Sequence, residues 1–452
     1  MKLAVPIHIR TGVMAMRRVL NSVTACGILL CLVVYLYTYN FYTGISRPLP
    51  DIRPILSHRM ILDASAEDNY HQKYVCSNQT HRNKVEDILC MTPPNFLDNY
   101  QNPCWKERGN GSGETSLKCL PYFHIIGAAK AGTTDLFSRI TMHPSIMKVD
   151  GFLQKETFYW SWRRYGKCEV SLRYCENFLT FNQFLSFFKS DKISLVRDAK
   201  MSYFLNGEIG SSSANLIRRN KENYHHMITG HADPMDLWGM YYWKDIPQNN
   251  ATLSEPVYTT PHLIHHINPA LKLIVILREP SERTYSHYLF RRLGNSAREF
   301  HHHAVGNFTL LNTCVKNVGS MRACLFNESL LEHYKRFPIH GSFYSILLKE
   351  WFSVFPREQF LIMRTEDYSS NMTSHLRKIF NFLEVDDITE TELNNMSRVP
   401  VRRITKHKKA IGNMLPETKL FLYKIFQPYT QELADILHDK RFLWEENSII
   451  SS

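Results

Sequence analysis

From residue 122 onward, the sequence alternates short apolar runs with amphipathic stretches, and this alternation limits the possible folds more than any other feature. The apolar runs are YFHIIG, KISLV, LKLIVIL and QFLIM, and helix-like stretches such as TTDLFSRI and LRKIFNFL follow them. Strands that alternate with helices predict an α/β fold whose mainly parallel central sheet is flanked by helices. LKLIVIL (271–277) is apolar on both faces, which is typical of a central strand covered by helices on each side.

The octapeptide GAAKAGTT (127–134) connects the first of these strands to a helix. We expect that helix to begin near Thr133 and to end about His143, because Pro144 disfavours helical backbone in the residue before it. Three apolar side chains share one side of the helix: Leu136, Phe137 and Ile140. Ligands of open parallel sheets bind at such strand-to-helix loops.

The small residues of this loop let backbone N–H groups approach an anion at the start of a helix. They are Gly127, Ala128, Ala129, Ala131 and Gly132. A Walker A loop has a lysine directly after its second glycine, but Thr133 stands at that position here. Lys130 instead lies in mid-loop, where it would face the anhydride bridge of a shorter nucleotide. This arrangement suits transfer of a terminal group without a metal ion and disfavours a nucleotide kinase.

A second motif, REPSERTYSHY (278–288), follows the strand LKLIVIL. It places Arg278 at the end of that strand and Ser286 eight positions later, on the next helix. An arginine binds phosphate bidentately, and a serine hydroxyl adds a hydrogen bond. The pair would hold a second phosphate of the same nucleotide, and Arg283 would either join them or face solvent.

Together the two motifs resemble those of the P-loop-like sulfotransferases, which use 3′-phosphoadenosine 5′-phosphosulfate (PAPS). GAAKAGTT is similar to their 5′-phosphosulfate loop, and REPSERTYSHY is similar to their 3′-phosphate motif. The resemblance spans about residues 120–445 and is strongest to the Golgi carbohydrate branch, particularly the N-acetylgalactosamine 4-sulfate 6-O-sulfotransferases. Further matching stretches are KETFYWSWRRYG, LPETKLFLYKIFQPYTQELADIL and RFLW. One departure is Ala129, which replaces a common proline, and we expect it to be tolerated.

The resemblance implies roles for the loop residues. Lys130 would stabilise charge on the phosphosulfate bridge as the sulfuryl group leaves; its alternative is a solvated surface lysine. The 5′-phosphate would be bound by Ala131, Gly132, Thr133 and Thr134. The two threonines are also expected to cap the helix, which by itself requires no ligand. Arg278 and Ser286 would bind the 3′-phosphate.

Glu156, in QKETFYW, matches the position of the catalytic glutamate in related heparan sulfotransferases. An alcohol is a weak nucleophile until a base takes its proton, and Glu156 would be that base. Lys155 would touch the sulfate or orient the carboxylate; the alternative is an exposed Lys–Glu pair. His143 is a weaker candidate base.

Two arginines after Glu156, Arg163 and Arg164, are expected either to meet acidic sugars or to lie on the surface. The aromatic residues between them and Glu156 are expected to be structural: Phe158, Tyr159, Trp160 and Trp162. The resemblance implies that the basic run VRRITKHKK (401–409) closes over PAPS, with Arg402, Arg403, Lys408 and Lys409 as contacts; the alternative is a solvated charge cluster.

Residues 19–39 form a 21-residue, mostly apolar run that is long enough to span a bilayer as a helix. Basic residues precede it at Lys2, Arg10, Arg17 and Arg18. They predict a cytoplasmic tail (1–18), a signal anchor (19–39), a lumenal stem with a cysteine-containing preface (40–120) and a catalytic domain (121–452). The alternative, a cleaved signal peptide, lacks a clear cleavage site.

Glycosylation sequons and cysteines are consistent with a lumenal location for the residues after the apolar run. The sequons are at Asn78, Asn110, Asn250, Asn307, Asn327, Asn371 and Asn395. Cys26 and Cys31 lie in the apolar run, and the other eight cysteines form an even set that an oxidising compartment would pair. The cysteines closest in sequence are Cys168 with Cys175 and Cys314 with Cys324, and we expect each pair to form a local disulfide. The four upstream cysteines would then pair among themselves.

The net charge of +12 permits a polyanionic partner. We expect an acidic glycosaminoglycan and no nucleic acid. No CxxC motif is present, and the histidines at 225–226, 265–266 and 301–303 are expected on solvated surfaces, so no metal is expected. The apolar run predicts a type II membrane protein, and the resemblance implies a Golgi sulfotransferase that acts on C6 of 4-sulfated N-acetylgalactosamine. The alternatives are uronyl or heparan acceptors and an inactive glycan-binding protein. The sequence does not predict the oligomeric state.

Overall fold

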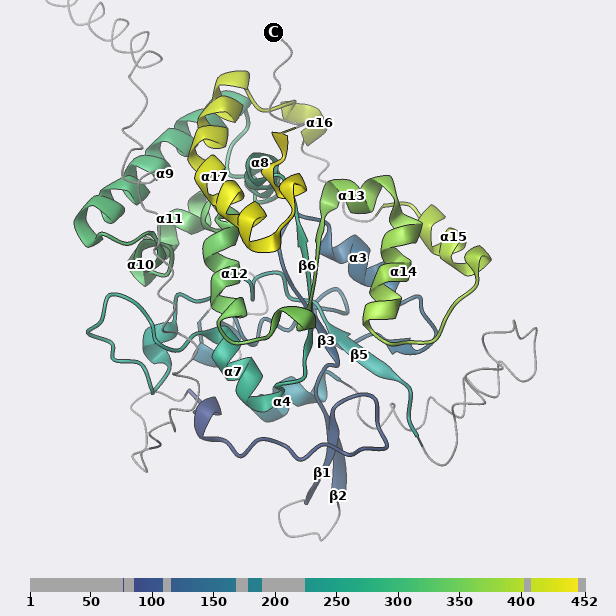
Figure 1. Ribbon diagram of the computed structural model, residues 1–452. Helices are drawn as coiled ribbons and strands as arrows, with labels where there is room; N and C mark the ends of the chain where they lie inside the picture. Colours follow the sequence, from purple (N-terminus) through teal and green to yellow (C-terminus); the bar gives the residue numbers. More distant parts are fainter. Residues whose placement is uncertain are drawn as a thin grey trace, which may run out of the picture. The chain divides into compact units, whose positions relative to one another are not determined.

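Five parallel strands form the centre of the fold (Figure 1). The computed structural model describes Cys76 and residues 85–108, 115–167, 178–188, 224–401 and 408–445. The strands of the sheet are β3 (Phe123–Gly127), β4 (Ile146–Met147), β5 (Ile228–His231), β6 (Lys272–Leu277) and β7 (Phe360–Arg364). They lie in the order β4-β5-β3-β6-β7, and every neighbouring pair is parallel. The predicted parallel sheet is therefore confirmed.

Strand β6 lies inside the sheet, as its composition predicts. It pairs with β3 on one edge and with β7 on the other, and all of its residues except Lys272 are buried. Every residue of β3 is buried too. Apolar side chains on both faces are stable here because helices cover the sheet on both sides. The predicted strand KISLV lies outside the described residues.

The order of the strands reverses direction at β3. From β3 the chain passes to β4 and β5 on one side, and then to β6 and β7 on the other. In open α/β sheets such a reversal opens a crevice beyond the carboxyl end of the strand, and ligands bind there. The loop after β3 is GAAKAGTT, so the topology places this motif at the reversal point.

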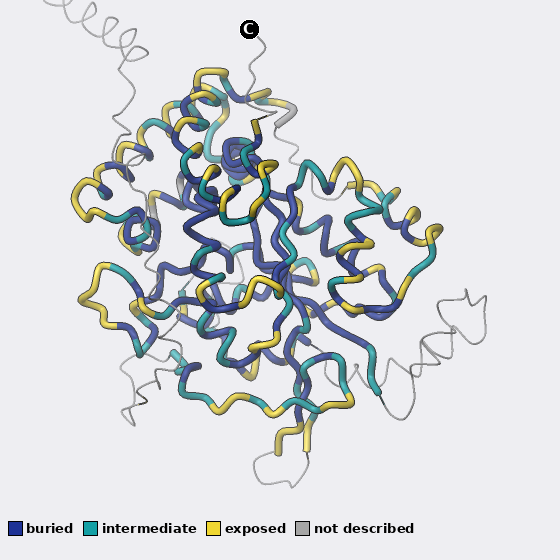
Figure 2. Tube along the Cα trace, in the orientation of Figure 1, coloured by how far each residue is buried: buried dark blue, intermediate teal, exposed yellow. Residues whose placement is uncertain are grey.

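Helices pack in two groups against this sheet. The helices are α3 (Thr133–Ile140), α4 (Phe181–Ser186), α7 (Thr260–Ile267), α8 (Pro280–Phe290), α9 (Ala297–Val318), α10 (Met321–Leu325), α11 (Leu331–Arg336), α12 (Tyr344–Phe352), α13 (Thr365–Ser370), α14 (Met372–Phe382), α15 (Glu390–Arg398), α16 (Lys408–Ile411) and α17 (Pro416–Leu437). Helix α14 contacts α3 and α15, whereas α17 contacts α8, α9 and α12. Figure 1 shows these groups on opposite sides of the strands, and Figure 2 shows that the centre of the sheet is mostly buried.

Helix α3 ends at Ile140, three residues before the predicted end. The next backbone N–H groups bond in tighter turns: Met142 donates to Arg139 and His143 donates to Ile140. The His143 ring is buried, with Nε2 2.9 Å from the carbonyl oxygen of Asp386. His143 therefore joins α3 to the segment before α15 and does not lie in an open cleft as a base would.

The described part of the cysteine-containing preface packs against the sheet. Strands β1 (Cys104–Arg108) and β2 (Thr115–Cys119) form an antiparallel hairpin, and the short helix η2 (Ile88–Cys90) buries two of its three side chains. The Asn102 side chain donates to the carbonyl of Leu120 at 2.7 Å and accepts from the N–H of Thr229 at 2.8 Å. Asn102 thus joins the hairpin to β5.

Three disulfides join the described cysteines. Cys314 pairs with Cys324, as predicted. Cys76 pairs with Cys90, and Cys104 pairs with Cys119, so the four upstream cysteines do pair among themselves. The predicted pair Cys168–Cys175 lies outside the described residues.

The predicted signal anchor (19–39) also lies outside the described residues. In the part of the chain that the structure describes, no helix is long and apolar enough to cross a membrane. Of the sequon asparagines, Asn250, Asn371 and Asn395 are exposed, and Asn307 and Asn327 are half-buried. Asn78 and Asn110 are not described, and glycosylation stays a prediction.

A buried arginine holds helix α15 against α3. Arg139, which is 1% exposed, donates from Nε to Asp135 Oδ2 at 2.8 Å and from Nη2 to the carbonyl of Val399 at 2.6 Å. It also donates to the carbonyls of Met396 and Ser397. These carbonyls lie at the end of α15, where a helix leaves acceptors without intrahelical partners. One guanidinium therefore satisfies several buried acceptors.

We predict that Arg139→Ala lowers the free energy of unfolding by about 3 kcal/mol, because it removes the cationic partner of the buried Asp135. The matched control is Arg377→Ala, which removes an exposed ion pair with Glu390. It should cost less than about 1 kcal/mol. Urea unfolding of both variants measures the difference, and equal losses would contradict the anchoring role of Arg139.

Candidate active site

The loop between β3 and α3 has the backbone of an anion cradle. Lys130 (φ 71°) and Gly132 (φ 101°) both have left-handed backbone. Gly132 is the N-cap of α3, and no side chain caps the helix there. The prediction that Thr133 and Thr134 cap the helix is therefore wrong, because the turn at Gly132 already makes Thr133 the first helical residue. Thr133 is buried, whereas Gly132 is exposed and Thr134 half-buried, so part of the helix start is open to a ligand.

Neighbouring strands hold this loop in place. The N–H of Ala128 donates to the carbonyl of Ile276 in β6 at 2.8 Å. The Thr365 hydroxyl lies 2.7 Å from the carbonyl oxygen of Ala131 and 3.0 Å from that of Leu277. Thr365 is the first residue of α13, directly after β7. The loop is thus tied to the ends of both β6 and β7.

The Lys130 side chain extends towards α8. Its Nζ lies 4.0 Å from the ring centroid of Phe290, the last residue of α8, in a cation–π contact. Burial lowers the pKa of His287 on the same helix, and the charges of Arg283, Arg291 and Lys130 lower it further. The lysine of the first motif therefore lies beside the helix that carries the second.

Arg278 follows the last residue of β6. Its Nη2 lies 3.2 Å from Glu282 Oε2, and a quarter of its side chain is exposed. The Tyr344 hydroxyl donates to its carbonyl at 2.8 Å and fixes the backbone. Ser286 lies further along α8 and is 8% exposed. A phosphate at Arg278 would compete with the Glu282 carboxylate for the guanidinium.

Arg283 is completely buried, so the prediction that it either joins the phosphate site or faces solvent is wrong. It donates to Ser342 Oγ at 2.5 Å and to the carbonyl of Pro338. Burial lowers its pKa to about 10, which leaves it protonated at neutral pH. The hydrogen bonds of Arg283 join α8 to the segment before α12, and the packing around α8 separates the guanidinium from solvent.

The third group of predicted residues lies at the end of β5. Lys155 is 1% exposed and donates to the Glu156 carboxylate and, at 3.1 Å, to the carbonyl of Ala232. The alternative of an exposed Lys–Glu pair is therefore wrong. The turn before them contains two residues with left-handed backbone, Leu153 (φ 56°) and Gln154 (φ 58°). Such strained positions are common at functional sites.

Three adjacent strand ends thus carry the three groups. Lys130 follows β3, Arg278 follows β6, and the Lys155–Glu156 pair is bonded to the residue after β5. β3 pairs with both β5 and β6, and all three run in the same direction. The carboxyl ends of parallel strands meet at one edge of a sheet, so the fold brings the predicted residues to the same edge.

The two arginines predicted to contact an acidic sugar, Arg163 and Arg164, differ in their burial. Arg164 is 1% exposed, with Nη2 3.0 Å from the carbonyl oxygen of Glu86 and its guanidinium over the ring of Tyr165. The prediction that it contacts an acidic sugar or lies on the surface is wrong, because the preface covers it. Arg163 is half-buried and donates to the carbonyl of Thr157 at 3.2 Å. The side chains of Lys408 and Lys409 lie outside the described part of the chain.

The aromatic run after Glu156 is structural, as predicted. Tyr159, Trp160 and Trp162 are buried, and Phe158 stacks on Trp162 with ring centroids 4.4 Å apart. Most of the histidine groups are less solvated than predicted: His225 stacks on Tyr100 at 4.1 Å, and only His302 and His303 are exposed. These rings fill gaps between the sheet domain and neighbouring segments.

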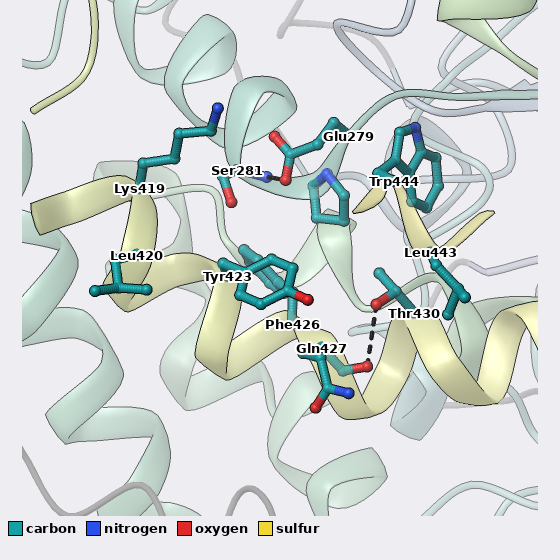
Figure 3. Close-up of a pocket in the computed structure, with 11 residues that line it drawn as sticks. Glu279, Ser281, Lys419, Leu420, Tyr423, Phe426, Gln427, Thr430, Leu443 and Trp444 are labelled. Atoms are coloured by element: carbon teal, nitrogen blue, oxygen red, sulfur yellow. Dashed lines mark hydrogen bonds between the residues drawn. The ribbon is translucent and has the colours of Figure 1, made fainter. Parts of the chain in front are cut away.

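A cavity of about 140 Å³ lies beside the start of α8 (Figure 3). Its walls come from Glu279, Pro280 and Ser281, from one side of α17, and from Leu443 and Trp444. Glu279 also caps α8 by accepting from the N–H groups of Ser281 and Glu282. None of the residues of GAAKAGTT lines this cavity, so it is distinct from the loop after β3.

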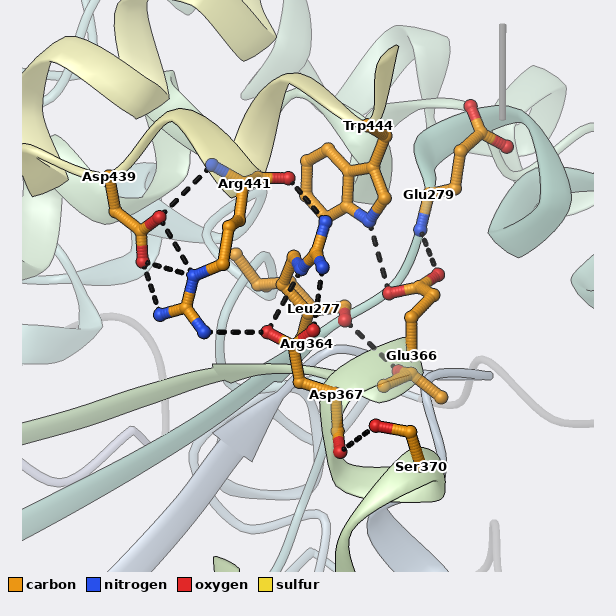
Figure 4. Close-up of polar contacts among 10 residues, drawn as sticks. Leu277, Glu279, Arg364, Glu366, Asp367, Ser370, Asp439, Arg441 and Trp444 are labelled. Atoms are coloured by element: carbon orange, nitrogen blue, oxygen red, sulfur yellow. Dashed lines mark hydrogen bonds and ion pairs between the residues drawn. The ribbon is translucent and has the colours of Figure 1, made fainter. Parts of the chain in front are cut away.

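Polar contacts fasten the C-terminal segment to the same edge of the sheet (Figure 4). Glu366 accepts from the N–H of Glu279 and from Trp444 Nε1, both at 3.0 Å. Arg364, the last residue of β7, pairs with Asp367 and donates to the carbonyl of Arg441 at 2.6 Å. The RFLW stretch (441–444) therefore supports the ends of β6 and β7.

Sequence reasoning missed several residues near this edge. Thr365 gave no signal, because a threonine after a strand is common. Asp233 and Asp236 are completely buried, and burial raises the pKa of both well above the ordinary range. The stretch HADPMD (231–236) follows an apolar strand, and this run of histidine and aspartate was a usable signal.

Comparison with known proteins agrees with this geometry. The sulfotransferase domain model matches residues 121–424, so the chain belongs to the sulfotransferase domain family. It is a PAPS-dependent sulfotransferase.

Its relatives include carbohydrate sulfotransferase 15 from Mus musculus, 27% identical over 430 residues that cover 86% of this chain and 73% of the relative. The Homo sapiens protein of the same name is 28% identical over 398 residues, which cover 79% of this chain and 67% of the relative. A sulfotransferase crystal structure from Alicyclobacillus acidocaldarius is 18% identical with a TM-score of 0.38 and covers 72% of this chain and 99% of that one.

We predict that Gly127→Ala destabilises the protein by about 1–3 kcal/mol, because its Cβ would lie 2.7 Å from Leu237 Cβ. The control is Gly306→Ala within α9, where a Cβ meets nothing within 4 Å. That change should be neutral or stabilise by up to about 1 kcal/mol. Thermal unfolding compares the two, and a Gly127→Ala protein as stable as the control would refute the close approach.

Proposed function

We propose that this sulfotransferase transfers the sulfuryl group of PAPS to a hydroxyl of a glycosaminoglycan. The observation that carries the proposal is the arrangement of Lys130, Arg278 and Glu156 at three adjacent strand ends. The names of the relatives support a carbohydrate acceptor. A net charge of +12 suits an acidic polysaccharide.

The residues at the ends of β3 and β6 fit a nucleotide with two separate phosphate groups. The start of α3, with its exposed Gly132, offers backbone N–H groups and a favourable dipole to the 5′-phosphate. Arg278 and Ser286 would bind the 3′-phosphate, and Arg278 would exchange its 3.2 Å contact with Glu282 for a phosphate oxygen. Since PAPS is consumed, it is a co-substrate.

Glu156 is the proposed base. Its carboxylate would take the proton of the acceptor hydroxyl while the hydroxyl oxygen bonds to sulfur and the bond from sulfur to the phosphate oxygen breaks. The leaving phosphate would gain negative charge, which the Lys130 ammonium would stabilise. Lys155 would hold the Glu156 carboxylate in position, because the two side chains form an ion pair and both are nearly buried.

For the acceptor we propose C6 of 4-sulfated N-acetylgalactosamine in chondroitin or dermatan sulfate. This choice rests on the resemblance of GAAKAGTT, REPSERTYSHY and KETFYWSWRRYG to enzymes of that specificity. Uronyl and heparan acceptors are the alternatives, and disaccharide analysis of the labelled product distinguishes all three.

We also propose a Golgi type II topology in which residues 19–39 anchor the chain and residues 121–452 form the lumenal catalytic domain. The basic residues before the apolar run support this orientation. The described disulfides support an oxidising compartment.

We predict that Lys130→Ala and Glu156→Gln each lower kcat by about 10²–10⁴-fold, because each removes a group that acts in the transition state. Transfer of radiolabelled sulfate from PAPS to 4-sulfated chondroitin by the full chain measures this loss. The exposed controls Lys316→Ala and Glu328→Gln should retain full activity. If the unmutated chain binds chondroitin but transfers no sulfate, the protein is a glycan-binding protein instead.

We predict that Arg278→Ala raises the Kd for 3′-phosphoadenosine 5′-phosphate about 10–100-fold, since it removes charge-assisted hydrogen bonds. Adenosine 5′-phosphate, which lacks the 3′-phosphate, should bind the variant and the unmutated protein equally well. Arg298→Ala, an exposed change on α9, is the control. An unchanged Kd for the bisphosphate would remove Arg278 from the site.

A further inference from the structure

Two histidines and an aspartate form a buried cluster beneath the candidate active site. His124 and Asp236 approach each other with Nε2 3.0 Å from Oδ2, and His231 Nδ1 lies 4.0 Å from the same oxygen. One ligand atom from each residue lies within 4.8 Å of the others. His124 is 1% exposed, and His231 and Asp236 are completely buried.

Strand pairing brings the two histidines together. His124 on β3 is the register partner of His231 on β5, and their ring centroids are 4.3 Å apart. Paired residues of neighbouring strands direct their side chains to the same face of a sheet. Asp236 comes from the segment after β5, whose Leu237 N–H donates to the carbonyl of Ile126 at 2.9 Å. That bond holds the aspartate over the two rings.

The atoms directed into this cluster have no hydrogen-bond partners among the described residues outside the cluster. They are His124 Nε2, His231 Nδ1, Asp236 Oδ1 and Asp236 Oδ2. A buried polar atom without a partner is unfavourable, so these atoms favour a ligand that bonds to them. The far side of one ring is satisfied, since His231 Nε2 lies 2.9 Å from Thr157 Oγ1.

Carboxyl groups outnumber cationic groups around the cluster. Asp233 lies within electrostatic reach of two other carboxyl groups, Asp236 and Glu156, and of one cationic side chain, Lys155.

We propose that His124, His231 and Asp236 bind a divalent zinc ion. Neutral imidazole and carboxylate are ligands that zinc accepts, and zinc–ligand bonds of about 2.0–2.1 Å place tetrahedral ligands about 3.4 Å apart. The 3.0 Å and 4.0 Å separations bracket that spacing. The Thr157 contact would orient the His231 ring, as an outer hydrogen bond does for most histidine ligands of metals.

The ion would stabilise the segments that hold the candidate active site. It would join β3, β5 and the segment 232–237, and this segment carries the Ala232 carbonyl that accepts from Lys155. The same segment carries Leu237, which packs against Gly127 at the start of the phosphate-binding loop. The role proposed for zinc is structural: the three ligands are buried, and none of them belongs to the proposed reacting groups.

The test uses the full chain, purified without a histidine tag and stripped with a chelator. Zinc is added, free zinc is removed, and the metal per chain is measured by mass spectrometry. We expect one zinc per chain and a rise in Tm on loading. Asp236→Asn keeps the size of the side chain but removes its charge, and it should lower zinc affinity at least tenfold and abolish the rise in Tm.

Two controls retain the cluster. His302→Gln removes an exposed histidine on α9. Asp386→Asn removes a carboxyl group that is 8% exposed and lies outside the cluster, in the segment before α15. Both should bind zinc like the unmutated chain. If Asp236→Asn binds zinc as tightly as these controls, or the unmutated chain retains none, the proposal is wrong.

Cobalt provides a readout that does not depend on any variant. Tetrahedral Co²⁺ absorbs visible light far more strongly than six-coordinate Co²⁺, so the unmutated chain loaded with cobalt should show the intense tetrahedral spectrum. Added zinc should remove it by displacement. A weak six-coordinate spectrum, or none, would overturn the proposal even if Asp236→Asn failed to fold.

Discussion

The backbone pairing of β3 with β5 on one edge and with β6 on the other determines where the candidate site residues lie. Because these strands are parallel, the segments that follow them emerge at one edge of the sheet. The loop with Lys130, the start of α8 with Arg278, and the Lys155–Glu156 pair depend on this arrangement. Thr365 and the RFLW stretch then add support from β7 and the C-terminal segment.

Burial gives the charged residues of this region their different roles. Arg139 and Arg283 are buried and donate to carbonyl, hydroxyl or carboxylate oxygens, so they join helices to their neighbours. Arg278 keeps a quarter of its side chain exposed and remains accessible to a ligand. The pair Lys155–Glu156 is intermediate: it is nearly buried, so its charges interact strongly. A zinc ion beneath it would offset the excess of carboxyl groups around Asp236.

Much of the fold and part of the site could be predicted from sequence, because their signals are local. The strand LKLIVIL, the loop before α3 and the disulfide Cys314–Cys324 are confirmed. The cap of α3 was predicted wrongly, since threonine is a good cap and only the backbone at Gly132 shows that the helix begins after it. Arg164 was also misjudged, because the preface that covers it is distant in sequence.

The sequence by itself determined the alternation of strands and helices, because periodicity is a property of short segments. Two short motifs also indicated the family and the residues proposed to bind two phosphates. The tertiary structure alone decided which charged side chains are buried, and that His124 and His231 are neighbours. Burial and strand pairing depend on segments about a hundred residues apart, 107 for these two histidines. No local pattern encodes such contacts, which only the folded chain brings together.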